Sequence, residues 1–115
     1  LAGRGLVPTA AASAPWAFDP RVAGQLNDPR LGNLAGRLTQ GDIANLLANP
    51  GAQRMLDVSP VARGYGPSIN VVQDVAGVML RITVSSTEMR VYSVGPIGPN
   101  AVTNGIARGR FFPLP

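Results

Sequence analysis

The chain has 115 residues, which suits one small domain, and its net charge is +4, with arginine as the only basic residue type. It contains no cysteine and no histidine, which excludes disulfides, thiolate and imidazole metal sites, and catalysis by Cys–His or Ser–His–Asp groups. Its 14 glycines and 11 prolines predict short elements joined by loops. No apolar run approaches the ~20 residues that span a bilayer.

Residues 1–20 are rich in alanine, proline and glycine, and we expect them to form an irregular arm ahead of a single domain at residues 21–115. The arm carries two aromatic side chains, Trp16 and Phe18. We interpret Trp16 as an anchor that pins the arm onto the core, because a lone tryptophan in a small domain is usually needed for burial. The alternative is an exposed aromatic docking site.

Short helices are predicted after the arm, at residues 20–26 and 29–37, from apolar residues at near-helical spacing. Asp28 is placed to cap the second of them, with Pro29 at its first position. The strongest helix pattern follows, from Thr39 to Ala48, where Thr39 and Asp42 have the spacing of a capping box. One more helical turn is expected at 51–56.

The region from 57 to 76 is expected to be a loop at 57–67 and then a short helix at 68–76. Asn70 is placed to cap this helix and Gly77 to end it. Its valine-rich composition also permits a strand. With the helical assignment, the helical part of the domain covers residues 21–76.

The clearest pattern in the sequence is a β-hairpin at residues 78–94. Apolar and polar residues alternate along its first strand, residues 85–88 supply a polar turn, and residues 89–94 form the second strand. A loop at 95–100, a turn at Asn104–Gly105 and a third strand at 106–112 complete a β part at 77–112. The predicted fold class is therefore α+β, with short helices followed by a small antiparallel sheet built on the 78–94 hairpin.

No catalytic, cofactor-binding or metal-binding residues are predicted. The 6 carboxylates are scattered, and no pattern pairs them for acid–base work or collects them into a metal site. The stretch GPIGPN at 95–100 is only superficially like a phosphate-binding loop, because its prolines remove backbone donors and we expect no helix to follow it. A non-enzymatic protein without a cofactor or small-molecule substrate is therefore expected.

Two stretches are similar to parts of a known family. YSVGP at 92–96 is similar to a stretch near the end of major pseudopilins, and the ending FFPLP is similar to their terminal strand. The order of elements is also similar to that of the large minor pseudopilin of type II secretion. The residues that match its pattern are Gly66, Pro67, Ser68, Asp74, Val75, Gly77, Thr83, Val84, Ser85, Met89 and Val91. The C-terminal part of the chain thus resembles type IV pilin-like proteins.

This resemblance implies an antiparallel sheet packed against helical elements and a structural role in an extracellular filament or a secretion pseudopilus. It also implies an extracellular or periplasmic location at the cell envelope, and other protein subunits as partners. The apolar N-terminal helix of that family is not in this sequence, so a longer native chain would have to supply it, together with any membrane contact. The acidic positions of calcium-binding pseudopilins have no evident counterpart here.

Two other function classes stay open. The first is a self-associating module of a different assembly, such as a capsid, tail or envelope component, that wraps its neighbours with residues 1–20 and the FFPLP tail. The second is an arginine-mediated polyanion binder. Nucleic acid ranks lower at this point, because the arginines are spread along the chain and form no basic run.

A partner-binding surface is predicted on the outer face of the hairpin, centred on Tyr92 and flanked by Arg81 and Arg90. The alternative is a mixed, solvated face without a partner. Further candidate contacts in the terminal segments are Trp16, Phe111 and Phe112.

Overall fold

The computed structural model describes residues 16–115, so most of the predicted arm lies outside the described range. Short helices and strands are mixed along the chain, which confirms the predicted α+β class. The elements in chain order, with η for 3-10 helices, are β1 (Ala17–Phe18), α1 (Arg21–Gln25), η2 (Pro29–Leu34), α2 (Gln40–Leu47), β2 (Gln53–Asp57), η3 (Ser59–Arg63), β3 (Ser68–Val75), β4 (Val78–Ser85), β5 (Arg90–Pro96), α3 (Pro99–Ala107) and β6 (Phe111–Pro113).

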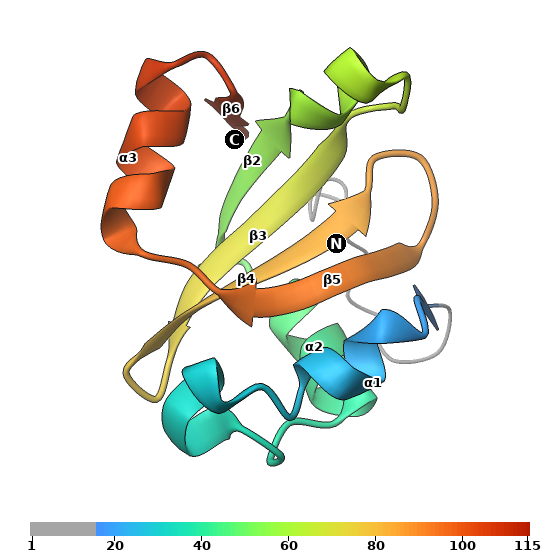
Figure 1. Ribbon diagram of the computed structural model, residues 1–115, viewed down its shortest axis with the longest axis vertical. Helices are drawn as coiled ribbons and strands as arrows, with labels where there is room; N and C mark the ends of the chain where they lie inside the picture. The colour runs from blue at the N-terminus through green and yellow to red at the C-terminus, as the bar shows by residue number, and fades with distance from the viewer. Residues whose placement is uncertain (1–15) are drawn as a thin grey trace.

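The described strands form one sheet in the order β1-β5-β4-β3-β2-β6. Every neighbouring pair is antiparallel except β1 and β5, which are parallel. The predicted hairpin is present as β4 and β5 at the middle of this sheet. Figure 1 shows α1 and α2 below β5, whereas α3 lies apart from them, beside β2 and β6.

One face of the sheet packs against α1, η2 and α2 and holds the main hydrophobic core. The alternation predicted for β4 is confirmed, because Leu80, Ile82 and Val84 are all buried on this face. Trp16 is also part of this core, with only 8% of its surface exposed, which confirms that it anchors the chain ahead of β1. The helical elements contribute Val22, Leu26, Leu31, Leu34, Ile43, Ala44 and Leu47.

The second face of the sheet is covered only in part. Met55, Val72 and Phe111 form a smaller buried cluster there, and Val102 of α3 packs against it. Beyond this cluster the second face is polar, because β-strand residues alternate between faces and the positions opposite the main core are occupied by hydrophilic side chains. The polar positions in paired register are Asp57, Ser68, Asn70, Thr83, Ser85 and Ser93.

Side-chain caps define the starts of η2 and α2, as the sequence predicts. Thr39 Oγ1 accepts a hydrogen bond from Asp42 N at 3.1 Å, and Asp42 Oδ2 accepts one from Thr39 N at 2.9 Å, which confirms the capping box. Asp28 accepts a hydrogen bond from Arg30 N at 2.9 Å with Pro29 in the first turn, also as predicted. The helix expected at 29–37 is a 3-10 helix that ends at Leu34.

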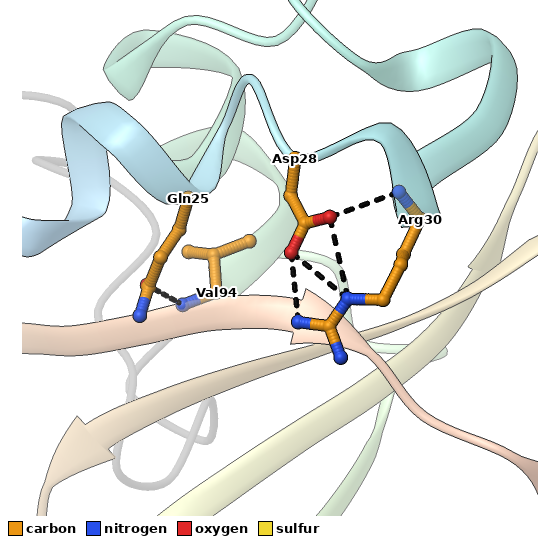
Figure 2. Close-up of polar contacts among 4 residues, drawn as sticks. All are labelled: Gln25, Asp28, Arg30 and Val94. Atoms are coloured by element: carbon orange, nitrogen blue, oxygen red, sulfur yellow. Dashed lines mark hydrogen bonds and ion pairs between the residues drawn. The ribbon is translucent and has the colours of Figure 1, made fainter.

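The outer edge of β5 is occupied by a side chain from α1. Gln25 Oε1 accepts a hydrogen bond from Val94 N at 2.8 Å, as Figure 2 shows. This backbone N–H is therefore not available to pair with another strand. The opposite edge strand, β6, has only 3 residues and ends in Pro113. Short, occupied edges disfavour the addition of a strand from another chain.

The prediction of a helical part at 21–76 is wrong in its second half. The turn expected at 51–56 is strand β2, and the helix expected at 68–76 is strand β3, so Asn70 is a strand residue and caps no helix. β3 lies between β2 and β4 and is buried on both faces, which removes the alternation that reveals a strand in the sequence. Its β-branched residues favour the extended conformation.

The β part predicted at 77–112 is also wrong in part, because it contains a helix. Residues 99–107 form α3, so a helix does follow GPIGPN, and Asn104–Gly105 lies inside it as helix rather than as a turn. Pro99 in the first turn of α3 is preorganised for a helix start. Of the strand expected at 106–112, only its end belongs to β6.

Candidate functional site

A groove of about 550 Å³ lies between the β4–β5 turn and the loop that joins η3 to β3. These two segments lie at the same end of the sheet in Figure 1. The volume is in the range of sites that hold small organic groups. The charged, aromatic and hydroxyl side chains that line the groove are Arg21, Arg63, Glu88, Tyr65, Tyr92, Ser68, Thr83, Ser85, Ser86, Thr87 and Ser93.

Two tyrosines line the groove from different elements. Tyr65 lies in the η3–β3 loop with 70% of its surface exposed. Gly64, just before it, has a φ of 85°, a left-handed conformation that ends η3 and suits glycine. Tyr92 lies on β5 at an irregularity in the register, where Thr83 pairs with Ser93 but Val84 pairs with Val91. The extra residue of this bulge allows both Tyr92 and Ser93 to line the groove.

Hydrogen bonds tie the two walls of the groove together. Ser86 Oγ, in the β4–β5 turn, donates a hydrogen bond to the carbonyl oxygen of Pro67 in the opposite loop at 2.7 Å. Ser85 Oγ shapes the turn by accepting hydrogen bonds from Thr87 N at 3.1 Å and Glu88 N at 3.0 Å. The polar turn predicted at 85–88 is therefore confirmed, and its hydroxyl groups form one wall of the groove.

Arginine predominates among the charged groups beside Tyr92. The Arg90 guanidinium lies 6.0 Å from the centroid of the Tyr92 ring. Asp19 joins Arg90 to Arg21, with Nη2 of Arg90 at 3.7 Å from Oδ2 and Nε of Arg21 at 3.0 Å from Oδ1. The backbone and side-chain hydrogen bonds from Arg21 lower the pKa of Asp19, so this carboxylate holds the arginines in place over a wide pH range.

A chain of polar side chains crosses the second face next to the groove. Thr83 Oγ1 donates a hydrogen bond to Asn70 Oδ1 at 2.8 Å, and Asn70 Nδ2 donates to Asp57 Oδ2 at 3.1 Å. The other oxygen of Asp57 accepts from Ser59 Oγ at 2.6 Å. Asp57 and Asn70 are buried, so these bonds replace the solvent that the groups lost on folding. The network gives the second face a fixed polar surface.

The predicted partner-binding residues fall into two groups in the structure. Tyr92, Arg81 and Arg90 lie on the hairpin, and all three are partly exposed. Tyr92 lines the groove, whereas Arg81 lies on the second face outside the groove lining. Phe111 is buried against the second face and Trp16 in the main core, so these two offer little surface to a partner. Phe112 is 48% exposed on β6, away from the groove lining.

The sequence interpretation missed Tyr65, Arg63 and the Asp57 network. The first two belong to VARGYGP, a stretch read only as a loop, although an aromatic residue between glycines was a usable signal for a displayed side chain. Asp57 and Asn70 come together only because β2 pairs with β3. The assignment of these segments as helical therefore concealed the network.

Within residues 16–115, no group of three or more acidic side chains is placed to hold a metal ion. No helix in the same range has the length and hydropathy needed to cross a membrane. Comparison with protein families, with curated proteins and with solved structures yields no match. The geometry of the groove therefore has to carry the functional interpretation.

Proposed function

We propose that this domain is a non-enzymatic binding module for single-stranded nucleic acid, held in the groove between the β4–β5 turn and the η3–β3 loop. The observation that carries the proposal is the meeting of Tyr65 and Tyr92 with Arg21 and Arg63 in one groove. Aromatic rings stack on bases of any sequence, and guanidinium groups pair with phosphates. The proposal belongs to the polyanion-binding class, and the tyrosine rings add contacts to planar bases beside the arginine contacts to phosphates.

The charge and polarity of the groove favour a nucleic acid over an uncharged peptide. Arg21 and Arg63 outnumber Glu88 among the charged residues of the lining, and hydroxyl groups line the wall formed by the β4–β5 turn. Hydroxyl groups can donate to phosphate and sugar oxygens and accept from base amines. The groove is local, and within residues 16–115 no long helix projects from it, so an unpaired strand with accessible bases fits better than a duplex.

Replacing an exposed ring tests the proposal without disturbing the core. Tyr65→Ala removes a side chain that is 70% exposed, so we expect a folded protein. Loss of one base-stacking partner costs about 1–3 kcal/mol, so affinity for a fluorescein-labelled single strand should fall by a factor between about 5 and about 150 in anisotropy titrations. Phe112→Ala is the matched control, an exposed aromatic outside the groove, and should keep wild-type affinity. Equal affinity of both variants and wild type argues against the groove.

A second candidate is the structural subunit of an assembly, in a filament, a secretion pseudopilus or another particle. It is favoured by exposed apolar side chains on one part of the fold, since Ile106 at the end of α3 is 39% exposed and Phe112 on β6 is 48% exposed. Contact between subunits would remove this surface from water. The extracellular or periplasmic location belongs to this candidate and stays a prediction.

Sedimentation velocity over a wide concentration range tests the assembly candidate. It predicts concentration-dependent oligomers that Phe112→Asp reduces, because a buried charge in a contact is unfavourable. A single monomeric species at every concentration counts against it. The outcome is independent of the strand-binding test, because the exposed residues of α3 and β6 do not line the groove.

A further inference from the structure

Arg81 is a half-buried arginine without an ion-pair partner in the described part of the chain. Its Nε lies away from solvent and makes no hydrogen bond there, and no carboxylate oxygen lies within 4.0 Å of its guanidinium. Burial lowers the pKa of Arg81, as expected for a cation that has lost water without gaining a counter-ion. A guanidinium in this position has unused directional donors.

The surroundings of Arg81 carry an excess of positive charge. Asp57 is the carboxylate that acts on Arg81 most favourably, but its oxygens are already bonded to Ser59 and Asn70. Arg110 and Arg30 both act on Arg81 as like charges. Arg110 shares Asp57 as well, with its Nε at 3.8 Å from Oδ1. An anion placed beside Arg81 would relieve this imbalance.

The position of Arg81 connects it to the groove. Arg81 pairs with Gly95 in the sheet, directly next to the Thr83–Ser93 pair that lines the groove. Adjacent positions on one face of a strand are about 7 Å apart, so Arg81 lies on the same face as Thr83, one position beyond the residues that line the groove. The guanidinium also lies close to the backbone of the neighbouring strand, because a Cβ added at Gly95 would lie 3.4 Å from Nη2 of Arg81.

We propose that Arg81 anchors a phosphate group of the nucleic-acid strand whose bases lie in the groove. The proposal rests on the proposed function and deepens it by fixing where the backbone of the strand enters the second face. A tetrahedral phosphate matches the fork of a guanidinium, and its negative charge would offset the repulsion between Arg81 and Arg110. Asp57 then retains its bonds to Ser59 and Asn70 and holds the floor of the site.

Arginine side-chain NMR observes the proposed contact directly. In ¹H–¹⁵N spectra of the wild-type protein, the Nε–H signal of Arg81 should shift in a saturable way on titration with pyrophosphate, whereas the Nε–H of the exposed Arg37 should follow only the ionic strength. A shift of Arg81 that is linear in salt and matches Arg37, or no shift at all, overturns the anchor. Sodium chloride at equal ionic strength is the reference titration.

Two variants test the anchor against strand affinity. Arg81→Gln should weaken binding of the single strand about tenfold, and Arg37→Gln, with the same change in net charge, less than about twofold. If Arg81→Gln does not fold, the pyrophosphate titration of the wild-type protein decides the proposal. Equal strand affinities in the two folded arginine variants contradict the proposal.

The two proposals fail in different ways. If pyrophosphate saturates the Arg81 signal while Tyr65→Ala leaves strand affinity unchanged, Arg81 is a phosphate site but strand binding in the groove is wrong. If strand affinity depends on Tyr65 but Arg81→Gln behaves like Arg37→Gln, the groove stands and the anchor is wrong.

Discussion

Gly105 shows how a single position couples α3 to the sheet. It is buried in the helix, and the ring of Phe111 occupies the space where a side chain at position 105 would project. Glycine is unfavourable in a helix interior, but here its missing side chain allows α3 to pack closely on β6. This contact helps determine how far α3 extends over the second face, and thus how much of that face remains open.

Gly105→Ala is expected to destabilise the protein by about 1–3 kcal/mol, because the added methyl group overlaps the Phe111 ring and the surroundings must shift. Urea unfolding followed by the fluorescence of buried Trp16 measures the change. The control is Gly41→Ala in α2, where the nearest atom to a Cβ is Thr39 Oγ1 at 3.6 Å, an ordinary contact. This control should be neutral or stabilising by up to about 1 kcal/mol. Equal stability of Gly105→Ala and wild type would show that the ring moves freely.

Elements specified by local signals were predictable from the sequence. The Thr39–Asp42 capping box defined α2, and the alternation in β4 defined the hairpin with its buried face. The segments that were misassigned depend on distant partners. β3 is a strand because β2 and β4 bond to it on both sides, and α3 is a helix although Asn104–Gly105 favours a turn.

The candidate site was predictable to the extent that it lies on the hairpin. The alternation in β4 put Arg81 opposite the buried Leu80 and Ile82, whereas the bulge at Tyr92 interrupts the period of two in β5. The opposite wall, with Arg63 and Tyr65, required knowledge that η3 and its loop lie over the β4–β5 turn. Because that placement depends on the pairing of β2 with β3, no local pattern in the sequence contained it.

The carboxylates that precede α1 and cap η2 are expected to make stability depend on pH. Hydrogen bonds from Arg21 and Arg30 lower the pKa values of Asp19 and Asp28 below the ordinary pKa of an aspartate. Their contribution to the free energy of unfolding is therefore fully present above the ordinary pKa of an aspartate. It is lost as the pH falls through the lower pKa of each group in the folded protein. Both carboxylates are partly exposed to solvent, so the effect is expected to be small.

The free energy of unfolding is measured at about pH 6 and about pH 3 for the wild-type protein and for the double variant Asp19→Asn/Asp28→Asn. The loss between the two pH values is then compared. Asparagine keeps a capping oxygen but does not titrate, so the variant should lose less stability on acidification. An identical loss in both proteins would mean that these carboxylates do not contribute to the acid response.

Taken together, the described residues form a sheet with one fully packed face, protected edges and a second face that α3 covers only in part. The polar remainder of that face, the groove at its end and the unpaired Arg81 are the features that packing alone leaves unexplained. Single-strand binding accounts for all of them with one ligand, because its bases and phosphates require different side chains.

Salt dependence of binding tests this account most directly. A labelled single strand of about 10 nucleotides is titrated with the wild-type protein at about 50 and about 200 mM salt. Each phosphate contact to a single strand contributes about −0.7 to the slope of log K against log salt concentration. Contacts from Arg21, Arg63 and Arg81 therefore predict saturable binding with a slope of about −2. No detectable binding at the lower salt concentration, or affinity that salt leaves unchanged, would contradict the account.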